Sequence, residues 1–427
     1  MAPRRVAVIG GGWAGMAAAV ECSLRGRAVS VFEMAPDCGG RARSVDINGL
    51  SLDNGQHILI GAYRECLRMM KTIGVDTDRA FVRSPLQLTT PDGQGLALPP
   101  GPSLVAFARG VLGHRAWPLK DRLALLSTAA SWAAGRFRCD EALDVHTLTA
   151  RLPATIRQQL IEPLCVAALN TPARHASASV FLRILRDALF SGRGCADLLL
   201  PRLRLGELFP RPAARWLEQR GATLHMSSRI TSIERSTHGW KIDGQLFDGA
   251  VIATTAVEAA RLVKDIAPAW ADVAGSLAYE PIVTVYARSP GALLPAKMLM
   301  LPSNERDAPA QFVFDLGQLG GPPGLLAFVI SGARPWIDYG IDVTERLTLA
   351  QGQALLAAHL KGPLQAVCTL TEKRATFRCV PNLRRPPGLI APGLHAAGDY
   401  IAGPYPATLE GAVNSGVMAA RSVWTSA

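Results

Sequence analysis

The chain has 427 residues, of which 49% are hydrophobic and 19% charged, and its formal net charge is +11. An apolar chain of this length builds two or three packed domains, which excludes an intrinsically disordered protein. A basic surface attracts acidic partners, but no nucleic-acid recognition module accompanies the scattered arginines. The charge therefore indicates an ordinary solvated surface or contact with an anionic membrane, and nucleic acid is not expected as a partner.

A strand–helix–strand unit is predicted at the start of the chain. Residues 6–9 (VAVI) and 29–32 (VSVF) are short apolar runs typical of buried parallel strands, and residues 16–24 form an Ala-rich helix between them. The turn at residues 10–15 reads GGGWAG, which matches G-x-G-x-x-G in the strand–turn–helix context that a dinucleotide-binding loop requires.

Each glycine of this loop has a physical role in such a site. Gly10 permits the tight turn, Gly12 lets a pyrophosphate approach the backbone, and Gly15 lets the helix pack closely on the strand. The helix N-terminus offers free N–H groups to the phosphates. Glu33 ends the second strand, where a carboxylate accepts hydrogen bonds from a ribose 2′-hydroxyl and disfavours a 2′-phosphate.

The segment from about 85 to 210 is rich in Leu, Ala and Arg and is mostly helical in period. It contains two amphipathic stretches with Trp117, Trp132 and several basic residues nearby. Such helices can lie on a bilayer or face an ordinary protein core, and both interpretations remain open. The predicted apolar faces are Leu104, Phe107, Ala108, Val111 and Leu112, and Leu119, Leu123, Leu126, Ala130 and Phe137.

From about residue 215 the chain returns to alternating strands and helices. The predicted strands are residues 222–225, 229–233, 240–242, 248–254, 282–286 and 325–330, and the predicted helix is 343–361.

Further motifs follow in a fixed order: GGRARS at 39–44, DNGQH at 53–57, LHAAGD at 394–399 and PATLEGA at 406–412. This ordered set resembles the flavin amine oxidase and carotenoid desaturase superfamily. The resemblance implies FAD as the cofactor and an α/β fold, with a discontinuous Rossmann-type FAD-binding domain and a substrate domain of mixed sheet and helices. The expected division is 1–80, 213–275 and 373–427 for FAD binding, 81–212 for a helical substrate- or membrane-facing insert, and 276–372 for the substrate domain.

The resemblance also implies roles for individual residues. Arg41 flanks the pyrophosphate and flavin, Asp399 binds the ribityl or pyrophosphate region, Ile230 contacts adenine through its backbone, and the helix that begins at Thr408-Leu409 points its N-terminus at the flavin. The residues assigned to the cofactor are Gly10, Gly12, Trp13, Ala14, Gly15, Glu33, Gly40, Arg41, Ala42, Asn54, Gly55, Gln56, Ile230, Gly398, Asp399, Thr408 and Leu409. No metal site is expected.

A narrower resemblance rests on residues 162–172 (EPLCVAALNTP), on DNGQH and on residues 405–412 (YPATLEGA). The chain is similar to the squalene-associated FAD-dependent desaturase family, also called hydroxysqualene dehydroxylases. This implies reductive removal of a hydroxyl from hydroxysqualene in squalene and hopanoid biosynthesis. The alternatives are a carotenoid-type desaturase, another enzyme of the superfamily, and a non-catalytic prenyl-binding escort protein.

Such a reaction needs an acid beside the flavin. His57 is the first candidate and Glu410 the second, although either could instead have a structural role. With one strand-linked G-x-G-x-x-G in the sequence, an external electron donor is expected. The eight cysteines are dispersed without a C-x-x-C pair, which favours a reducing cytoplasm over a disulfide framework or a zinc site. The expected location is therefore the cytoplasm, with peripheral contact at the inner face of the membrane.

Overall fold

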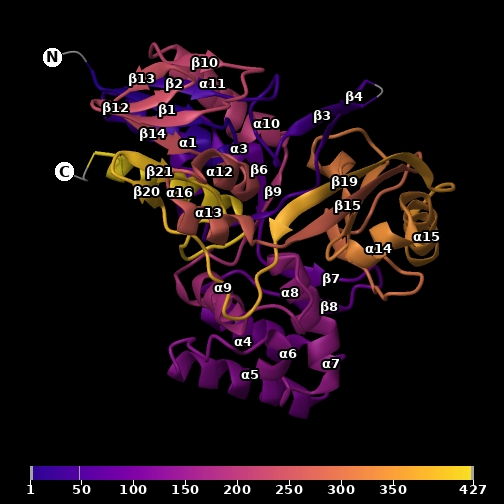
Figure 1. Ribbon diagram of the computed structural model, residues 1–427. Helices are drawn as coiled ribbons and strands as arrows, with labels where there is room; N and C mark the ends of the chain where they lie inside the picture. Colours follow the sequence, from indigo (N-terminus) through magenta and orange to yellow (C-terminus); the bar gives the residue numbers. More distant parts are fainter. Residues whose placement is uncertain (1–2, 48, 425–427) are drawn as a thin grey trace.

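A computed structural model of the chain describes residues 3–47 and 49–424, and it contains two main sheets and a helical insert (Figure 1). The first sheet has six strands in the order β10-β2-β1-β14-β21-β20, all parallel except the edge strand β20. Its strands are β10 (Thr223–His225), β2 (Ala28–Phe32), β1 (Arg5–Ile9), β14 (Gly249–Ile252), β21 (Leu394–Ala396) and β20 (Leu389–Ala391).

The side chains of β1 alternate between two apolar layers, because successive residues of a strand point to opposite faces. Val6 and Val8 pack with helices α1 (Trp13–Leu24), α11 (Pro210–Glu218) and α16 (Leu409–Ser422). Ala7 and Ile9 face the small antiparallel sheet β11-β12-β13 and helix α12 on the other side. Those elements are β11 (Ile233–Ser236), β12 (Gly239–Ile242), β13 (Gln245–Phe247), α12 (Ala256–Val263) and α13 (Pro268–Gly275).

The second sheet is antiparallel, in the order β16-β17-β18-β15-β19. Along β18, Leu326, Phe328 and Ile330 pack in the layer that holds α14 and α15, whereas Ala327 and Val329 face the interior of the molecule. The elements are β15 (Tyr279–Arg288), β16 (Met298–Met300), β17 (Phe312–Asp315), β18 (Leu325–Ile330), α14 (Arg334–Tyr339), α15 (Ile341–Leu355) and β19 (Gln365–Phe377).

The insert lies at the end of the molecule remote from the six-stranded sheet (Figure 1). Its helices are α4 (Ser103–Gly113), α5 (Leu119–Ala134), α6 (Val145–Leu148), α7 (Ala154–Ile156), α8 (Glu162–Leu169) and α9 (Ala178–Phe190). Short strands join it to the rest: β9 (Leu198–Pro201) pairs with β5 (Leu59–Ile60) and β6 (Phe81–Ser84), and β7 (Gln87–Thr89) pairs with β8 (Gly95–Ala97). Further elements are the hairpin β3 (Ser44–Ile47) and β4 (Leu50–Asp53), and the helices α2 (Arg64–Thr72), α3 (Thr77–Ala80) and α10 (Leu205–Leu208).

Several sequence expectations need correction. The predicted strand at 229–233 is an extended loop up to Ser232, and the predicted helix at 343–361 ends at Leu355. The boundary at 212 falls inside α11, whose apolar face packs in the same core layer as α1, and the boundary at 372 falls inside β19. Neither expected boundary coincides with the end of a helix or strand, because changes in composition along the chain do not mark where an element ends.

The predicted apolar faces of the insert also need correction. In α4, Ala106, Phe107 and Val111 are buried but Leu104 and Leu112 are exposed, so one helix serves two environments. Trp117 is buried and donates to Gln159 Oε1 at 2.7 Å, so it is not a surface anchor. Among the residues that the structure describes, no helix has both the length and the apolar character required to cross a bilayer.

Candidate functional site

The glycine loop joins β1 to α1 at the point where β2 and β14 lie on opposite sides of β1. Ligands of open parallel sheets bind at this switch point. Gly10 has φ +108°, and a Cβ there would lie 2.6 Å from the Ala253 carbonyl oxygen. A Cβ on Gly15 would lie 1.8 Å from the Gly10 carbonyl oxygen, so this glycine is required by the packing of helix on strand.

Gly12 differs from both of these glycines. A Cβ built on it would have no neighbour nearer than the Gly40 Cα at 3.8 Å, and its φ of −72° suits any residue. The protein itself therefore leaves room for a Cβ at this position. The empty space lies at the N-terminus of α1, where the helix dipole and free N–H groups favour a phosphate.

Glu33 lies immediately beyond β2 with its side chain buried. Its carboxylate accepts from the Gly11 N–H at 2.6 Å and from the Ala35 N–H at 2.8 Å. These two bonds fix the carboxylate at the rim of the cavity described below while leaving lone pairs for a ribose hydroxyl.

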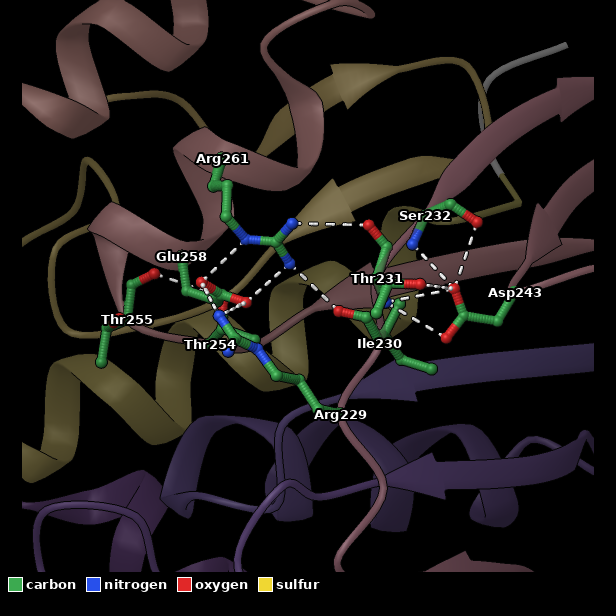
Figure 2. A network of polar contacts seen from close by, with 9 residues as sticks. All are labelled: Arg229, Ile230, Thr231, Ser232, Asp243, Thr254, Thr255, Glu258 and Arg261. Atoms are coloured by element: carbon green, nitrogen blue, oxygen red, sulfur yellow. Dashed lines mark hydrogen bonds and ion pairs between the residues drawn. The ribbon is translucent and has the colours of Figure 1, made fainter.

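The loop that carries Ile230 is held by a polar network (Figure 2). Arg261 on α12 donates to the Ile230 carbonyl oxygen at 3.1 Å and forms an ion pair with Glu258 at 2.8 Å. On the other side, the Asp243 carboxylate accepts from the backbone N–H groups of Thr231 and Ser232. The network fixes the backbone of a residue that lines the cavity, as an adenine contact through the backbone requires.

Arg41 and Asp399 meet although they are 358 residues apart in the sequence. Arg41 Nη2 lies 2.5 Å from Asp399 Oδ1, and Arg41 Nη1 donates to the Ala375 carbonyl oxygen at 2.9 Å. Asn54 donates to the Arg41 carbonyl oxygen at 3.2 Å and to Glu372 Oε2 at 2.9 Å. The three predicted cofactor residues Arg41, Asn54 and Asp399 thus form one connected cluster.

Helix α16 begins where the sequence predicted. Thr408 caps it by accepting from the Gly411 N–H at 3.0 Å, and Leu409 is its first residue. Gly416 contacts α1 closely, since a Cβ there would lie 2.1 Å from the Ala14 carbonyl oxygen. Leu409, at the positive end of α16, lines the same cavity as the glycine loop, where negative charge on a bound cofactor would be stabilised.

The two candidate acids lie in different surroundings. His57 lines the cavity, and its Nδ1 is 3.1 Å from the Gly55 carbonyl oxygen. Burial lowers the pKa of His57 below its usual range, with an opposing effect from the Gly55 carbonyl. Glu410 instead accepts from the backbone N–H groups of Glu65 and Cys66 at 2.9 Å each, at the start of α2.

This position does not fit Glu410 as a proton donor to a substrate. Its side chain is buried and absent from the cavity lining, and both carboxylate oxygens are used to cap α2. Burial raises the pKa of Glu410, and the two N–H groups oppose that rise. The geometry therefore gives Glu410 a structural role at the start of α2, and the expectation that it is the acid is not supported.

A single cavity of about 940 Å³ connects these residues. It is lined by every predicted cofactor residue except Gly15, which lies behind the loop, and by His57. Away from the glycine loop its wall is apolar and comes from the insert and from β17. That wall includes Phe107, Leu125, Trp132, Leu164, Leu185 and Phe314.

The structure adds lining residues that were not predicted. The hydroxyl of Thr284, on β15, is buried near Gly55 and has no hydrogen-bond partner among the described residues. Asp187 and Tyr405 also line the cavity, and Asp187 is held by Arg183 at 2.9 Å. Tyr405 belongs to the YPATLEGA motif at 405–412. No motif in the sequence marks Thr284 or Asp187, since only packing brings them to the cavity. An unsatisfied donor beside a glycine-lined cradle is what a polar ligand would complete.

Asp53, which begins the DNGQH motif, is buried next to the residues of that motif that line the cavity, but does not line the cavity itself. Its buried carboxylate accepts from the Leu205 N–H at 2.9 Å, and burial raises its pKa to about 6. Because the unfolded pKa is about 3.9, this carboxyl contributes full stability below about pH 4 and loses that contribution as pH rises through about 6.

We therefore expect Asp53→Asn to raise the free energy of unfolding at about pH 7.5 by on the order of 2 kcal/mol, since the amide oxygen can still accept the same bond. The difference between variant and parent should shrink toward about pH 4. Urea denaturation at several pH values measures this, with the exposed Asp338→Asn as control. Equal destabilisation at both ends of the pH range would show that the negative charge itself is needed.

Comparison with known proteins agrees with this geometry. The sequence model of the family described as flavin containing amine oxidoreductase matches residues 13–424 of this chain. A hydroxysqualene dehydroxylase of Sinorhizobium fredii is 28% identical over 98% of this chain and 98% of its own. A zeta-carotene desaturase of Zea mays is 40% identical, but over 17% of this chain and 13% of its own. The crystal structure of an oxidoreductase from Methanosarcina mazei superposes with a TM-score of 0.75, at 16% identity, over 98% of this chain and 99% of that one.

The sheet, the glycine loop and the cluster around Arg41 define an FAD-dependent oxidoreductase. The match over nearly the whole chain places it more narrowly: the chain belongs to the flavin containing amine oxidoreductase family. Both the cofactor and the enzymatic character inferred from the sequence are confirmed, which removes the escort-protein alternative.

Proposed function

We propose that this enzyme reductively removes the hydroxyl of hydroxysqualene and releases squalene. The observation that carries the proposal is the single cavity in which a polar, glycine-lined end continues into an apolar end walled by α4, α5, α8, α9 and β17. A hydrocarbon chain with one hydroxyl matches that division. The full-length similarity to a hydroxysqualene dehydroxylase supports the same substrate, whereas the carotene desaturase similarity covers a short part of both chains.

The reaction breaks one C–O bond and forms one C–H bond. Bound FAD, once reduced, supplies the hydride, and a proton leaves with the hydroxyl as water. The protein's own residues exclude water from the carbon that loses its hydroxyl, through the apolar wall that includes Leu164 and Phe314.

We further propose that an external donor reduces the enzyme, and that the protein is cytoplasmic with peripheral contact at the inner membrane face.

The proposed proton donor is His57. Since Nδ1 is bound to the Gly55 carbonyl, proton exchange falls to Nε2. Because burial lowers the pKa of His57, the protonated form is a minority at neutral pH. We expect turnover to increase as the pH falls below about 6.5, the ordinary value for histidine. His57→Gln should lower turnover by about 10²-fold or more and remove this pH dependence. An unchanged pH profile in the variant would exclude His57 as the donor.

The function itself is tested without oxygen. The FAD-bound protein is reduced chemically, hydroxysqualene is added, and the flavin spectrum and lipid products are followed. Flavin reoxidation with stoichiometric squalene is the expected result. If the flavin stays reduced with hydroxysqualene, while the oxidised protein is bleached by a saturated polyisoprenoid, the enzyme is a desaturase and the proposal is wrong.

A further inference from the structure

Helices α4 and α5 carry an unusual concentration of exposed apolar side chains. Five of the fourteen exposed large apolar residues in the described part of the chain lie on these two helices. They are Leu104 (50% exposed), Val105 (51%), Leu112 (45%), Leu119 (57%) and Leu123 (51%), and we call them the leucine face. Exposed apolar side chains concentrated on two adjacent helices indicate a contact with an apolar partner.

The charges on α4, on α5 and in the turn between them are mainly basic, although the exposed Asp140 and Glu141 follow shortly after α5. Residues 100–138 contain six cationic side chains and one acidic one, Asp121, which is buried. This short segment therefore holds +5 of the chain's net charge of +11. The exposed cations of this segment are Arg109, Arg115, Lys120, Arg136 and Arg138.

The same two helices form part of the cavity wall. Phe107 of α4, and Leu125 and Trp132 of α5, line the cavity, whereas the leucine face points to solvent. Arg122 of α5 donates to the Leu112 carbonyl oxygen at the end of α4 and so ties the helices together. In Figure 1 the pair forms the extremity of the molecule opposite the six-stranded sheet. A surface at this position can approach a flat partner without obstruction.

We propose that the leucine face and its basic rim dock on an anionic lipid bilayer, and that the substrate enters the cavity from the bilayer between or beside α4 and α5. Apolar side chains enter the boundary between headgroups and acyl chains while cations at the rim meet lipid phosphates. The entry route rests on the proposed apolar substrate, but the docking does not. A bilayer fits better than a protein partner because the exposed charged side chains of α4, of α5 and of the turn between them are all cationic. The cavity behind the face also suits a molecule that is stored in membranes.

The docking is tested by flotation of the FAD-bound protein with vesicles of phosphatidylcholine alone, or with about 30% phosphatidylglycerol. We expect binding to the anionic vesicles that weakens as salt screens the charges. Leu119→Ser/Leu123→Ser should lower the bound-to-free ratio by about tenfold or more, because two exposed leucines no longer leave water. Arg115→Gln/Lys120→Gln should lower it by about tenfold on anionic vesicles alone. The control pair Leu246→Ser/Leu293→Ser removes two exposed leucines elsewhere and should bind as the parent does.

Turnover of hydroxysqualene dispersed in detergent separates this proposal from the proposed function. If the parent protein turns over the dispersed substrate but floats with neither vesicle, the docking proposal is wrong and the function stands. If it floats but turns over nothing, the function is wrong and the docking stands. Equal loss of binding in the control pair would place the contact elsewhere. A parent dimer that becomes monomeric in Leu119→Ser/Leu123→Ser, measured by light scattering, would show that a second copy covers the face and would overturn the proposal.

Discussion

Gly12→Val should abolish FAD binding and leave the fold of the apoprotein intact. A Cβ at this position meets nothing nearer than the Gly40 Cα at 3.8 Å, and the backbone φ of −72° is ordinary. In the holoprotein the same volume is where the pyrophosphate would approach the N-terminus of α1. We expect the dissociation constant for FAD to rise by at least about 100-fold, since overpacking costs about 3 kcal/mol. The free energy of unfolding of the apoprotein should change by no more than about 1 kcal/mol.

The measurements are the flavin absorbance of the purified protein, a titration of the apoprotein with FAD, and urea denaturation of the apoprotein. Two matched variants frame the result. Gly15→Ala should lower both stability and FAD affinity, because its Cβ would lie 1.8 Å from the Gly10 carbonyl oxygen, and Gly113→Ala, with no atom within 4 Å, should lower neither. A Gly12→Val protein that binds FAD as tightly as the parent would show that no phosphate lies at this loop.

Arg41→Ala should destabilise the protein by about 3–5 kcal/mol even before FAD is added. The substitution leaves Asp399, whose side chain is 8% exposed, as a buried carboxylate without its cation. It also removes the donor to the Ala375 carbonyl oxygen. FAD affinity should fall in parallel, because Arg41 and Asp399 both line the cavity.

Urea denaturation of the apoprotein tests this with a double-mutant cycle. Asp399→Asn in the Arg41→Ala background should recover part of the lost stability, since no charge is then left unpaired. Arg79→Ala breaks an ion pair whose side chains are 90% and 57% exposed, and should change stability by less than about 0.5 kcal/mol. Strict additivity of Arg41→Ala and Asp399→Asn would mean that the two groups are not coupled and that the ion pair does not organise the site.

Local patterns predicted the nucleotide end of the site because the chemistry there is carried by short segments. The loop at Gly10–Gly15 and the start of α16 at Leu409 are backbone features. Glycines permit the conformation of the loop, and the capping Thr408 determines where the helix begins. Glu33 could be placed because a fixed number of residues separates it from the loop. The roles of these residues toward FAD remain predictions that the Gly12 and Arg41 variants test.

The structure differs from the sequence predictions where one segment contacts two different environments. Leu104 and Phe107 share a helical face by periodicity, yet the structure exposes one and buries the other in the cavity wall. Likewise Glu410 stands beside the flavin motifs in sequence, but its carboxylate points to the N-terminus of α2. Periodicity and proximity in sequence do not encode which neighbour a side chain meets.

The sequence by itself determined the α/β class and four of the six strands of the first sheet, because these depend on residue types at short, fixed spacings. Its ordered motifs also carried the resemblance that implied the cofactor and the family. Only the tertiary structure decided that Arg41 meets Asp399, that Thr284 lies beside the DNGQH loop, and that the cavity continues into the helical insert. These contacts join segments hundreds of residues apart. The physical reason is that long-range packing depends on the combined burial of many apolar side chains, each of which is only weakly specific. A single short segment of the sequence therefore does not determine which distant segment it will contact.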